Sequence, residues 1–223
     1  MGNFNEDMEQ ISAAASHDLR DPLRMALQHC KTLSADGASQ NQEAHNAIVQ
    51  CINTTIANIE VIRKYTYLAQ NTEVPKPVML ETVLQKAKSN NAALIAQRNA
   101  VIRWSNAELA LNARPAQLEL MFTHIFDNAL KYNDHPAPLV QVAISTTPQQ
   151  CRCIVTDNGI GMEPEFAFLV MGLFKRVNPN GAIRGLGAGL AYAKKVVENH
   201  GGCIRIECNE SQGCSVDVVL SIK

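Results

Sequence analysis

The stretch "IVTDNGIGM", residues 154–162, decides the fold expected for the second part of the chain. An apolar, strand-like run ends at Asp157 and passes into a turn, because Asp-Asn-Gly is a strong turn signal. A carboxylate in this place can accept hydrogen bonds from an exocyclic amine such as that of adenine. Gly159 and Gly161 let the backbone approach a flat base closely. The stretch therefore predicts either a base-binding loop or an ordinary turn after a strand.

A second glycine-rich stretch, "RGLGAGLAYAKKVVENHGG" (184–202), leads into an expected helix over residues 188–200. Gly185, Gly187 and Gly189 leave the N–H groups at the start of that helix open, which makes an anion site suited to phosphates. The spacing G-x-G-x-G is weak evidence by itself, and it differs from the dinucleotide-binding G-x-G-x-x-G pattern.

Strand and helix patterns alternate around these two loops from Val78 onward. Runs of apolar and β-branched residues between turn signals predict strands, and apolar residues at spacings of three and four predict helices. We expect strands at 77–80, 100–104, 109–112, 139–146, 151–157, 203–208 and 214–221, and helices at 81–98, 115–132 and 188–200. A mixed sheet with helices on one side is an α/β sandwich.

The helix expected at 115–132 carries three polar residues on one face, His124, Asn128 and Lys131, at i, i+4 and i+7. An amide oxygen suits a hard cation such as Mg²⁺, and a lysine can meet a phosphate as a point charge. A solvated helix face is the plain alternative for this trio.

The first third of the chain predicts two amphipathic helices. Apolar residues recur at spacings of three and four from Ile11 to Leu33 and from Ala44 to Ile62. "NTEVPKP" (71–77) ends the second stripe, since its two prolines cannot continue a helix. A hairpin of about 70 residues cannot cover both stripes alone, so we expect a homodimer with a four-helix bundle.

His17 falls opposite the first apolar stripe and is expected to face water. Asp18 can accept a hydrogen bond from one imidazole nitrogen and so make the other nitrogen more nucleophilic. Pro22 removes the backbone hydrogen bond to the Asp18 carbonyl and loosens the helix one turn from the histidine. An ordinary surface histidine, and a plain kink at Pro22, are the simpler alternatives.

Composition excludes several classes of protein. The 223 residues are 46% hydrophobic with a net charge of -1, which argues against nucleic acid or an anionic membrane as the main partner. No apolar run approaches the roughly 18 residues of a membrane span, and no signal-like N-terminus is present, so we expect a cytoplasmic protein without direct membrane contact. The seven cysteines are expected to be reduced and mostly buried, without zinc-ligand spacing.

The order of these features resembles the catalytic core of two-component sensor histidine kinases over nearly the whole chain. "SHDLRDPL" (16–23) resembles the H box, "HIFDNALKYN" (124–133) the N box, "DNGIGM" (157–162) the G1 box, "VMGLFKRV" (170–177) the F box and "GLGAGLA" (185–191) the G2 box. The chain is most similar to kinases attached to bacterial phytochromes. The resemblance implies an antiparallel helical hairpin that forms a dimeric four-helix bundle, followed by a Bergerat-type (GHKL) α/β sandwich, the fold shared with gyrase and Hsp90.

The resemblance also implies domains at 1–72 and 73–223, ATP and Mg²⁺ as ligands, and a response-regulator receiver domain as partner. An N-terminal sensor module is expected to be missing from this chain. His17 would be the phosphoacceptor with Asp18 as its base, and Asn128 would bind Mg²⁺. Residues 178–184 would form a mobile lid. Nucleotide contacts are implied for Asn128, Lys131, Tyr132, Asp157, Gly159, Gly161, Phe174, Lys175, Arg176, Gly185, Gly187, Gly189 and Leu190.

Three positions depart from the family pattern. His124 stands where a second asparagine is usual, Leu186 where a small hydroxyl residue is usual, and Met171 in place of an aromatic residue. Imidazole is a poorer partner for Mg²⁺ than an oxygen ligand. These departures keep open a degenerate kinase that acts as a dimeric binding, phosphatase or phosphorelay module with weak ATP binding. An ATPase like gyrase or Hsp90 is disfavoured, because such enzymes place an acid where this chain has His124.

Overall fold

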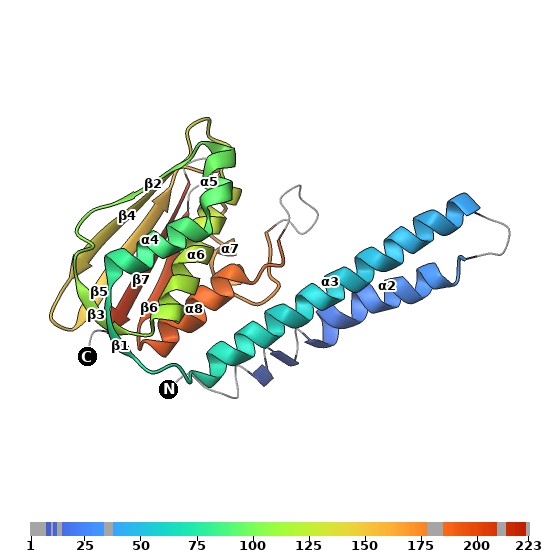
Figure 1. Cartoon of the computed structure of the whole chain (residues 1–223), viewed down its shortest axis with the longest axis horizontal. Coiled ribbons are helices and arrows are strands. Elements are labelled where there is room, and N and C mark those ends of the chain that lie inside the picture. The colour runs from blue at the N-terminus through green and yellow to red at the C-terminus, as the bar shows by residue number, and fades with distance from the viewer. Residues whose placement is uncertain are drawn as a thin grey trace. The chain divides into compact units, whose positions relative to one another are not determined.

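The computed structural model describes residues 8–9, 11–12, 15–33, 38–177, 185–208 and 213–221. Two compact units are present: a helical one that ends at Ala69 and a larger one that begins at Gln70 (Figure 1). The change from helices alone to alternating strands and helices occurs at this boundary.

The helical unit is a hairpin. It consists of the π-helix η1 (Ala15–Leu19), α2 (Arg20–Cys30) and α3 (Ala38–Gln70), and α2 lies alongside α3 (Figure 1). The expectation of one regular helix along the first apolar stripe is wrong over η1, where the helical turn is wider. Pro22 gives a physical reason, because its ring crowds the carbonyl of Asp18 and a wider turn relieves that contact.

The hairpin buries only part of its apolar surface within one chain. Ala26, Ala44 and Cys51 are buried. Exposed fractions between 42% and 65% remain for the large apolar residues Leu23, Met25, Leu27, Leu33, Val49, Ile52, Ile56 and Ile59. Among the described helices, none is both long and apolar enough to cross a bilayer.

The larger unit is built on a five-stranded mixed sheet in the order β2-β4-β5-β7-β6. Strand β2 pairs parallel with β4, and the other neighbours pair antiparallel. A separate antiparallel pair joins β1 to β3. The strands are β1 (Lys76–Met79), β2 (Val101–Trp104), β3 (Ala110–Ala113), β4 (Leu139–Thr146), β5 (Gln150–Asp157), β6 (Cys203–Cys208) and β7 (Cys214–Ser221), and each confirms a strand expected from the sequence.

Helices cover one face of this sheet (Figure 1). They are α4 (Leu80–Asn90), α5 (Ala92–Arg98), α6 (Pro115–Lys131), α7 (Phe166–Leu169) and α8 (Gly189–Asn199). Helix α6 packs between α4 and α8 and lies on β4 and β5. Its aromatic side chains Phe122 and Phe126 are fully buried, as are Cys151 and Cys153 of β5. The helix-on-sheet core expected from the alternating pattern is confirmed.

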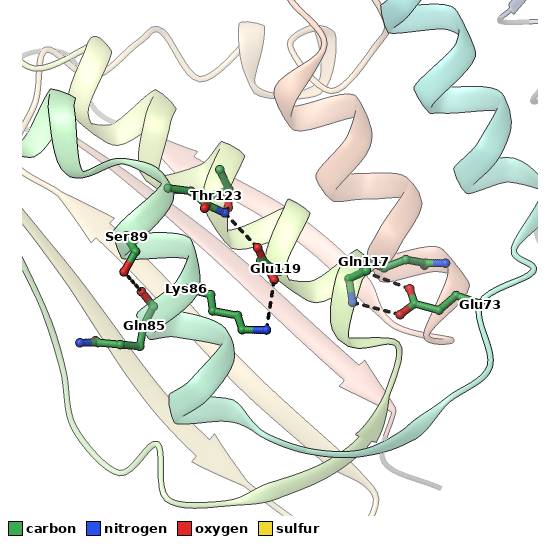
Figure 2. A network of polar contacts seen from close by, with 9 residues as sticks. Glu73, Gln85, Lys86, Ser89, Gln117, Glu119 and Thr123 are labelled. Atoms are coloured by element: carbon green, nitrogen blue, oxygen red, sulfur yellow. Dashed lines mark hydrogen bonds and ion pairs between the residues drawn. The ribbon is translucent and has the colours of Figure 1, made fainter.

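Polar contacts hold the start and the middle of α6. The Glu73 carboxylate accepts hydrogen bonds from the backbone N–H groups of Ala116 (3.0 Å) and Gln117 (3.2 Å), so it caps the positive end of the helix. One turn on, Glu119 accepts a 3.1 Å hydrogen bond from Asn90 of α4. Figure 2 shows Glu73 beside Gln117, and Glu119 facing α4. These contacts fix the helix that carries the candidate site.

A second expectation about local structure is wrong. The single helix expected at 81–98 is broken at Asn91, which separates α4 from α5. The buried Asn91 amide donates to the carbonyl oxygens of Ala87 (3.0 Å) and of Thr123 in α6 (3.1 Å). A side chain that binds backbone carbonyls in this way competes with the continuation of the helix.

The expectation that all seven cysteines are reduced is also wrong. Cys208 and Cys214 form a disulfide, because they are directly opposed at the paired ends of β6 and β7. Two of the five free cysteines, Cys30 and Cys203, are exposed.

Candidate functional site

His17 points away from the hairpin, with 77% of its side chain exposed, which confirms the expected orientation. Its Nδ1 lies 3.7 Å from a carboxylate oxygen of Asp18, and its Nε2 lies 3.4 Å from one of Asp21. Each carboxylate can hold a proton on the nitrogen beside it. Asp21 was not predicted as a site residue, although its i+4 spacing from His17 places it on the same helix face.

In the larger unit, strand β5 presents the Asp157 carboxylate at its end. Its Oδ1 accepts hydrogen bonds from the backbone N–H groups of Gly159 (2.8 Å) and Cys214 (3.3 Å). Burial raises the pKa of the Asp157 carboxyl, and these two hydrogen bonds offset part of the rise. Because both bonds go to Oδ1, Oδ2 is suited to accept a hydrogen bond from a ligand amine.

The loop after β5 is in close contact with the end of α6. A Cβ atom at Gly159 would lie 2.3 Å from the backbone oxygen of Tyr132 and 2.9 Å from Asp157 Oδ1. The same Tyr132 oxygen accepts a 3.0 Å hydrogen bond from the N–H of Ile160. Gly161 has φ +67°, a conformation that glycine adopts without strain. Packing of the loop on Tyr132 therefore requires glycine at 159, and the close approach of a base to these two glycines stays a prediction.

Asn158 holds this loop in place. Its Oδ1 accepts hydrogen bonds from the N–H of Leu139 (2.8 Å) and the amide of Asn133 (3.0 Å). Its own amide donates to the carbonyl oxygen of Ala137 (3.1 Å). In the sequence, Asn158 stands out only as part of the Asp-Asn-Gly turn signal. Its three partners lie 19 to 25 positions earlier in the chain, so no local pattern reveals them.

The three polar residues of α6 have different surroundings, and all are half-buried. Lys131 Nζ lies 2.6 Å from a carboxylate oxygen of Asp127, so the predicted phosphate ligand is part of an ion pair. The His124 ring packs against Tyr192 of α8, with 5.2 Å between ring centroids. A Cβ atom at Gly189 would lie 3.4 Å from the same ring. The plain alternative of a solvated helix face therefore does not describe His124.

The glycine-rich loop before α8 is tightly packed at one of its glycines. Gly187 has φ +66°, and a Cβ atom there would lie 2.7 Å from the backbone oxygen of Lys175 and 2.9 Å from the carbonyl carbon of Phe174. Among the residues that the structure describes, none has an atom within 4 Å of the Cβ position of Gly185. Leu190 and Arg176 are half-buried and Lys175 is exposed. The lid predicted at residues 178–184 lies outside the described residues.

The residues present fit a magnesium-bound nucleoside triphosphate. Asp157 can bind a base amine at Oδ2, Gly159 lets the loop after β5 pack directly on the backbone of Tyr132, and Gly189 begins α8 without a side chain. Asn128 offers an amide oxygen on the intervening helix. Within the described part of the chain, no group of three or more histidine, cysteine, aspartate or glutamate residues can hold a metal. Magnesium here would depend on phosphate and water ligands as well.

Residues 113–223 match the family model described as histidine kinase-, DNA gyrase B-, and HSP90-like ATPase. Cyanobacterial phytochrome A of Nostoc sp. is 26% identical over 215 residues, which cover 95% of this chain and 28% of that protein. The methanogenesis regulatory histidine kinase FilI of Methanothrix harundinacea is 26% identical over 217 residues, which cover 95% of this chain and 24% of that protein. The chain thus spans about a quarter of the length of these relatives.

Among solved structures, that of histidine kinase ThkA in complex with the response regulator protein TrrA is similar, with a TM-score of 0.70 and 14% identity. The match covers 99% of this chain and 64% of that chain. At this identity the likeness shows the fold alone. The expected helical hairpin followed by a Bergerat-type α/β sandwich is confirmed.

Proposed function

Because residues 113–223 belong to the histidine kinase-, DNA gyrase B- and HSP90-like ATPase family, and the chain has the catalytic core of a sensor histidine kinase, we propose that it phosphorylates its own His17 with ATP. The phosphoryl group then passes to an aspartate of a response-regulator receiver domain. The observation that carries the proposal is the exposed imidazole of His17 with a carboxylate beside each ring nitrogen.

In the proposed reaction, one nitrogen of His17 forms a bond to the γ-phosphorus of ATP as the bond from that phosphorus to ADP breaks. When Nε2 attacks, Asp18 beside Nδ1 accepts the proton that the ring must lose. The phosphohistidine then remains neutral at the ring. Bound ATP supplies the phosphoryl group, and Mg²⁺ offsets the charge of the phosphates.

The nucleotide would be held by the residues around α6 and the two glycine loops. Asp157 would accept the adenine amine at Oδ2, and Asn128 would bind Mg²⁺. The backbone at Gly185, Gly187 and Gly189 would face the phosphates at the start of α8. Secondary contacts are proposed for Lys131, Tyr132, Gly159, Gly161, Phe174, Lys175, Arg176 and Leu190.

Incubation with Mg²⁺ and γ-labelled ATP tests the proposal. We expect the label to enter wild type and the His45→Asn variant, and to be absent from His17→Asn. His45 is the matched control, since it is an exposed histidine on α3 of the same hairpin. Label in the His17→Asn variant, or none in wild type, would reject the proposal.

The proposed partners follow from the same reaction. Residues 1–72 would form the dimerisation and phosphotransfer hairpin and residues 73–223 the catalytic domain of a cytoplasmic homodimer without direct membrane contact. The exposed apolar residues of α2 and α3 support the homodimer, because water-exposed apolar surface of this extent marks an interface. A sensor module preceding this chain would supply the input, and a receiver domain would accept the phosphoryl group.

A further inference from the structure

One buried polar contact in the hairpin has no part in the chemistry described above. Asn58 of α3 is only 6% exposed. Its amide nitrogen donates a 2.7 Å hydrogen bond to the backbone carbonyl oxygen of Asp18, the residue that follows His17. This bond joins residues 40 positions apart and links the two helical segments of the hairpin.

The acceptor is the carbonyl group that Pro22 deprives of its usual donor. In a regular helix the oxygen of residue 18 accepts from the N–H of residue 22, and proline has no N–H. A helical carbonyl without a donor turns toward water, and the helix bends there. Here the Asn58 amide replaces the missing backbone donor from the neighbouring helix.

The position of this contact matters because the local helix is irregular. His17 and Asp18 belong to the π-helix η1, whose wide turn is less regular than an α-helix. A fixed Asp18 carbonyl fixes the peptide plane at that residue and limits the directions open to the neighbouring side chains. The ring of His17 is itself 77% exposed, so surrounding side chains restrain it little.

We propose that Asn58 is a positioning residue for His17. Asn58 holds the helix interrupted by Pro22 in the conformation that presents the imidazole of His17 for phosphorylation. This inference rests on the proposed function, since it concerns the same reaction. Asn58 acts through the backbone of Asp18, and its effect should appear in the rate at saturating nucleotide. Nucleotide affinity should not change, because Asn58 belongs to the helical unit.

The test is the Asn58→Leu variant, which keeps most of the side-chain volume and removes the donor. We expect the labelling rate of His17 at saturating Mg-ATP to fall about tenfold or more, since small misplacements of a reacting group carry large rate costs. The KM for ATP should stay within about twofold of wild type. Asn53→Leu is the matched control, because Asn53 is an exposed asparagine on the same helix, and it should keep the wild-type rate.

A second variant separates positioning from simple stability. Pro22→Ala restores a backbone N–H one turn after Asp18, so the carbonyl no longer needs Asn58. In that background, Asn58→Leu should change the rate by less than about twofold. An equal loss of rate in both backgrounds, or no loss with Pro22 in place, would overturn the inference.

Hydrogen exchange tests the role of Asn58 without requiring kinase activity. Asn58→Leu should speed amide exchange over residues 18–24 when Pro22 is present and leave it unchanged in the Pro22→Ala background. If wild type takes up no label, the proposed function fails, and this exchange pattern still decides whether Asn58 holds the helix. Exchange that is unaffected by Asn58→Leu would overturn the inference in either case.

Discussion

At the scale of single residues, Asp157 combines burial with two backbone hydrogen bonds to one of its oxygens. Its raised pKa means that ionisation of this carboxyl weakens the fold near neutral pH, because the folded state holds the proton more tightly than the unfolded state. A group that costs stability in this way is typical of a binding site.

The Asp157→Asn variant should therefore bind nucleotide more weakly without loss of stability. We expect an affinity for a fluorescent ATP analogue that is about tenfold lower or worse, because a hydrogen bond to a charged group contributes roughly 1.5–3 kcal/mol. The melting temperature of the free protein should be unchanged or higher. Asp217→Asn is the control, since Asp217 pairs with Arg152 in β5 and should leave affinity unchanged. Equal affinities for wild type and Asp157→Asn would contradict the assignment.

His200 gives a second prediction at this scale. It is buried at the end of α8, where its Nε2 accepts a hydrogen bond from the N–H of Arg114 and its Nδ1 lies 2.7 Å from the oxygen of Val196. Burial lowers the pKa of His200, and the positive charge of Arg114 lowers it further. The hydrogen bond to Val196 and the negative charge of Glu73 raise the pKa, but by less. At this residue the unfolded chain therefore takes up a proton at a higher pH than the folded chain, and the contribution of His200 to stability falls as the pH drops below about 6.5.

Urea unfolding followed by the single tryptophan, Trp104, measures this loss in the larger unit. Wild type should lose up to about 1.4 kcal/mol per pH unit below pH 6.5, and His200→Gln should lose less. His45→Gln, at an exposed position, should behave as wild type. A wild-type slope in His200→Gln would show that other groups cause the pH dependence.

At the scale of structural elements, the packing of the glycine loop before α8 depends far more on Gly187 than on Gly185. Gly187 has a positive φ and packs against the backbone of Phe174 and Lys175, whereas no described residue lies within 4 Å of the Cβ position of Gly185. Phe174 itself has φ +58°, a strained conformation for a residue with a side chain, and it lies where the F-box and G2-box segments touch.

Alanine at these two glycines should therefore give unequal losses of stability. Gly187→Ala should lower the melting temperature of the larger unit by about 5 °C, because a left-handed residue with a side chain costs roughly 1–3 kcal/mol. Gly185→Ala should lower it far less. Thermal unfolding monitored at Trp104 makes the comparison. Equal shifts for the two variants would contradict the packing described for Gly187.

At the scale of the whole molecule, the hairpin leaves too much apolar surface exposed for one chain. Ile56 is 55% exposed and Ile59 is 48% exposed, although both lie in a long helix of a compact unit. A second copy of the hairpin would cover such a surface, as in other four-helix bundles.

We expect wild type to elute as a dimer in light scattering coupled to size exclusion. Ile56→Glu should shift it toward the 24.4 kDa monomer, because a charge in an apolar interface is not compensated. Phe168→Glu should remain dimeric, since Phe168 is 78% exposed but belongs to the larger unit. A monomeric wild type, or a dimeric Ile56→Glu, would exclude the proposed interface.

The sequence by itself determined the strands and the direction of His17. The strands at 139–146, 203–208 and 214–221 occur at the expected residues, because alternating side chains and turn residues are local signals. The outward position of His17 followed from helical periodicity for the same reason. The two glycine-rich loops were also visible in sequence, since glycine marks places where the backbone needs room.

Only the tertiary structure showed how distant residues complete these elements. Asn58 supplies the donor that Pro22 lacks, Thr123 of α6 stabilises the break at Asn91, and Asn158 binds residues that precede its strand. The disulfide between Cys208 and Cys214 likewise depends on the pairing of β6 with β7. Periodicity reports which face a side chain occupies, whereas a hydrogen-bond partner is set by packing between segments far apart in the chain. A single sequence holds no local signal for that packing.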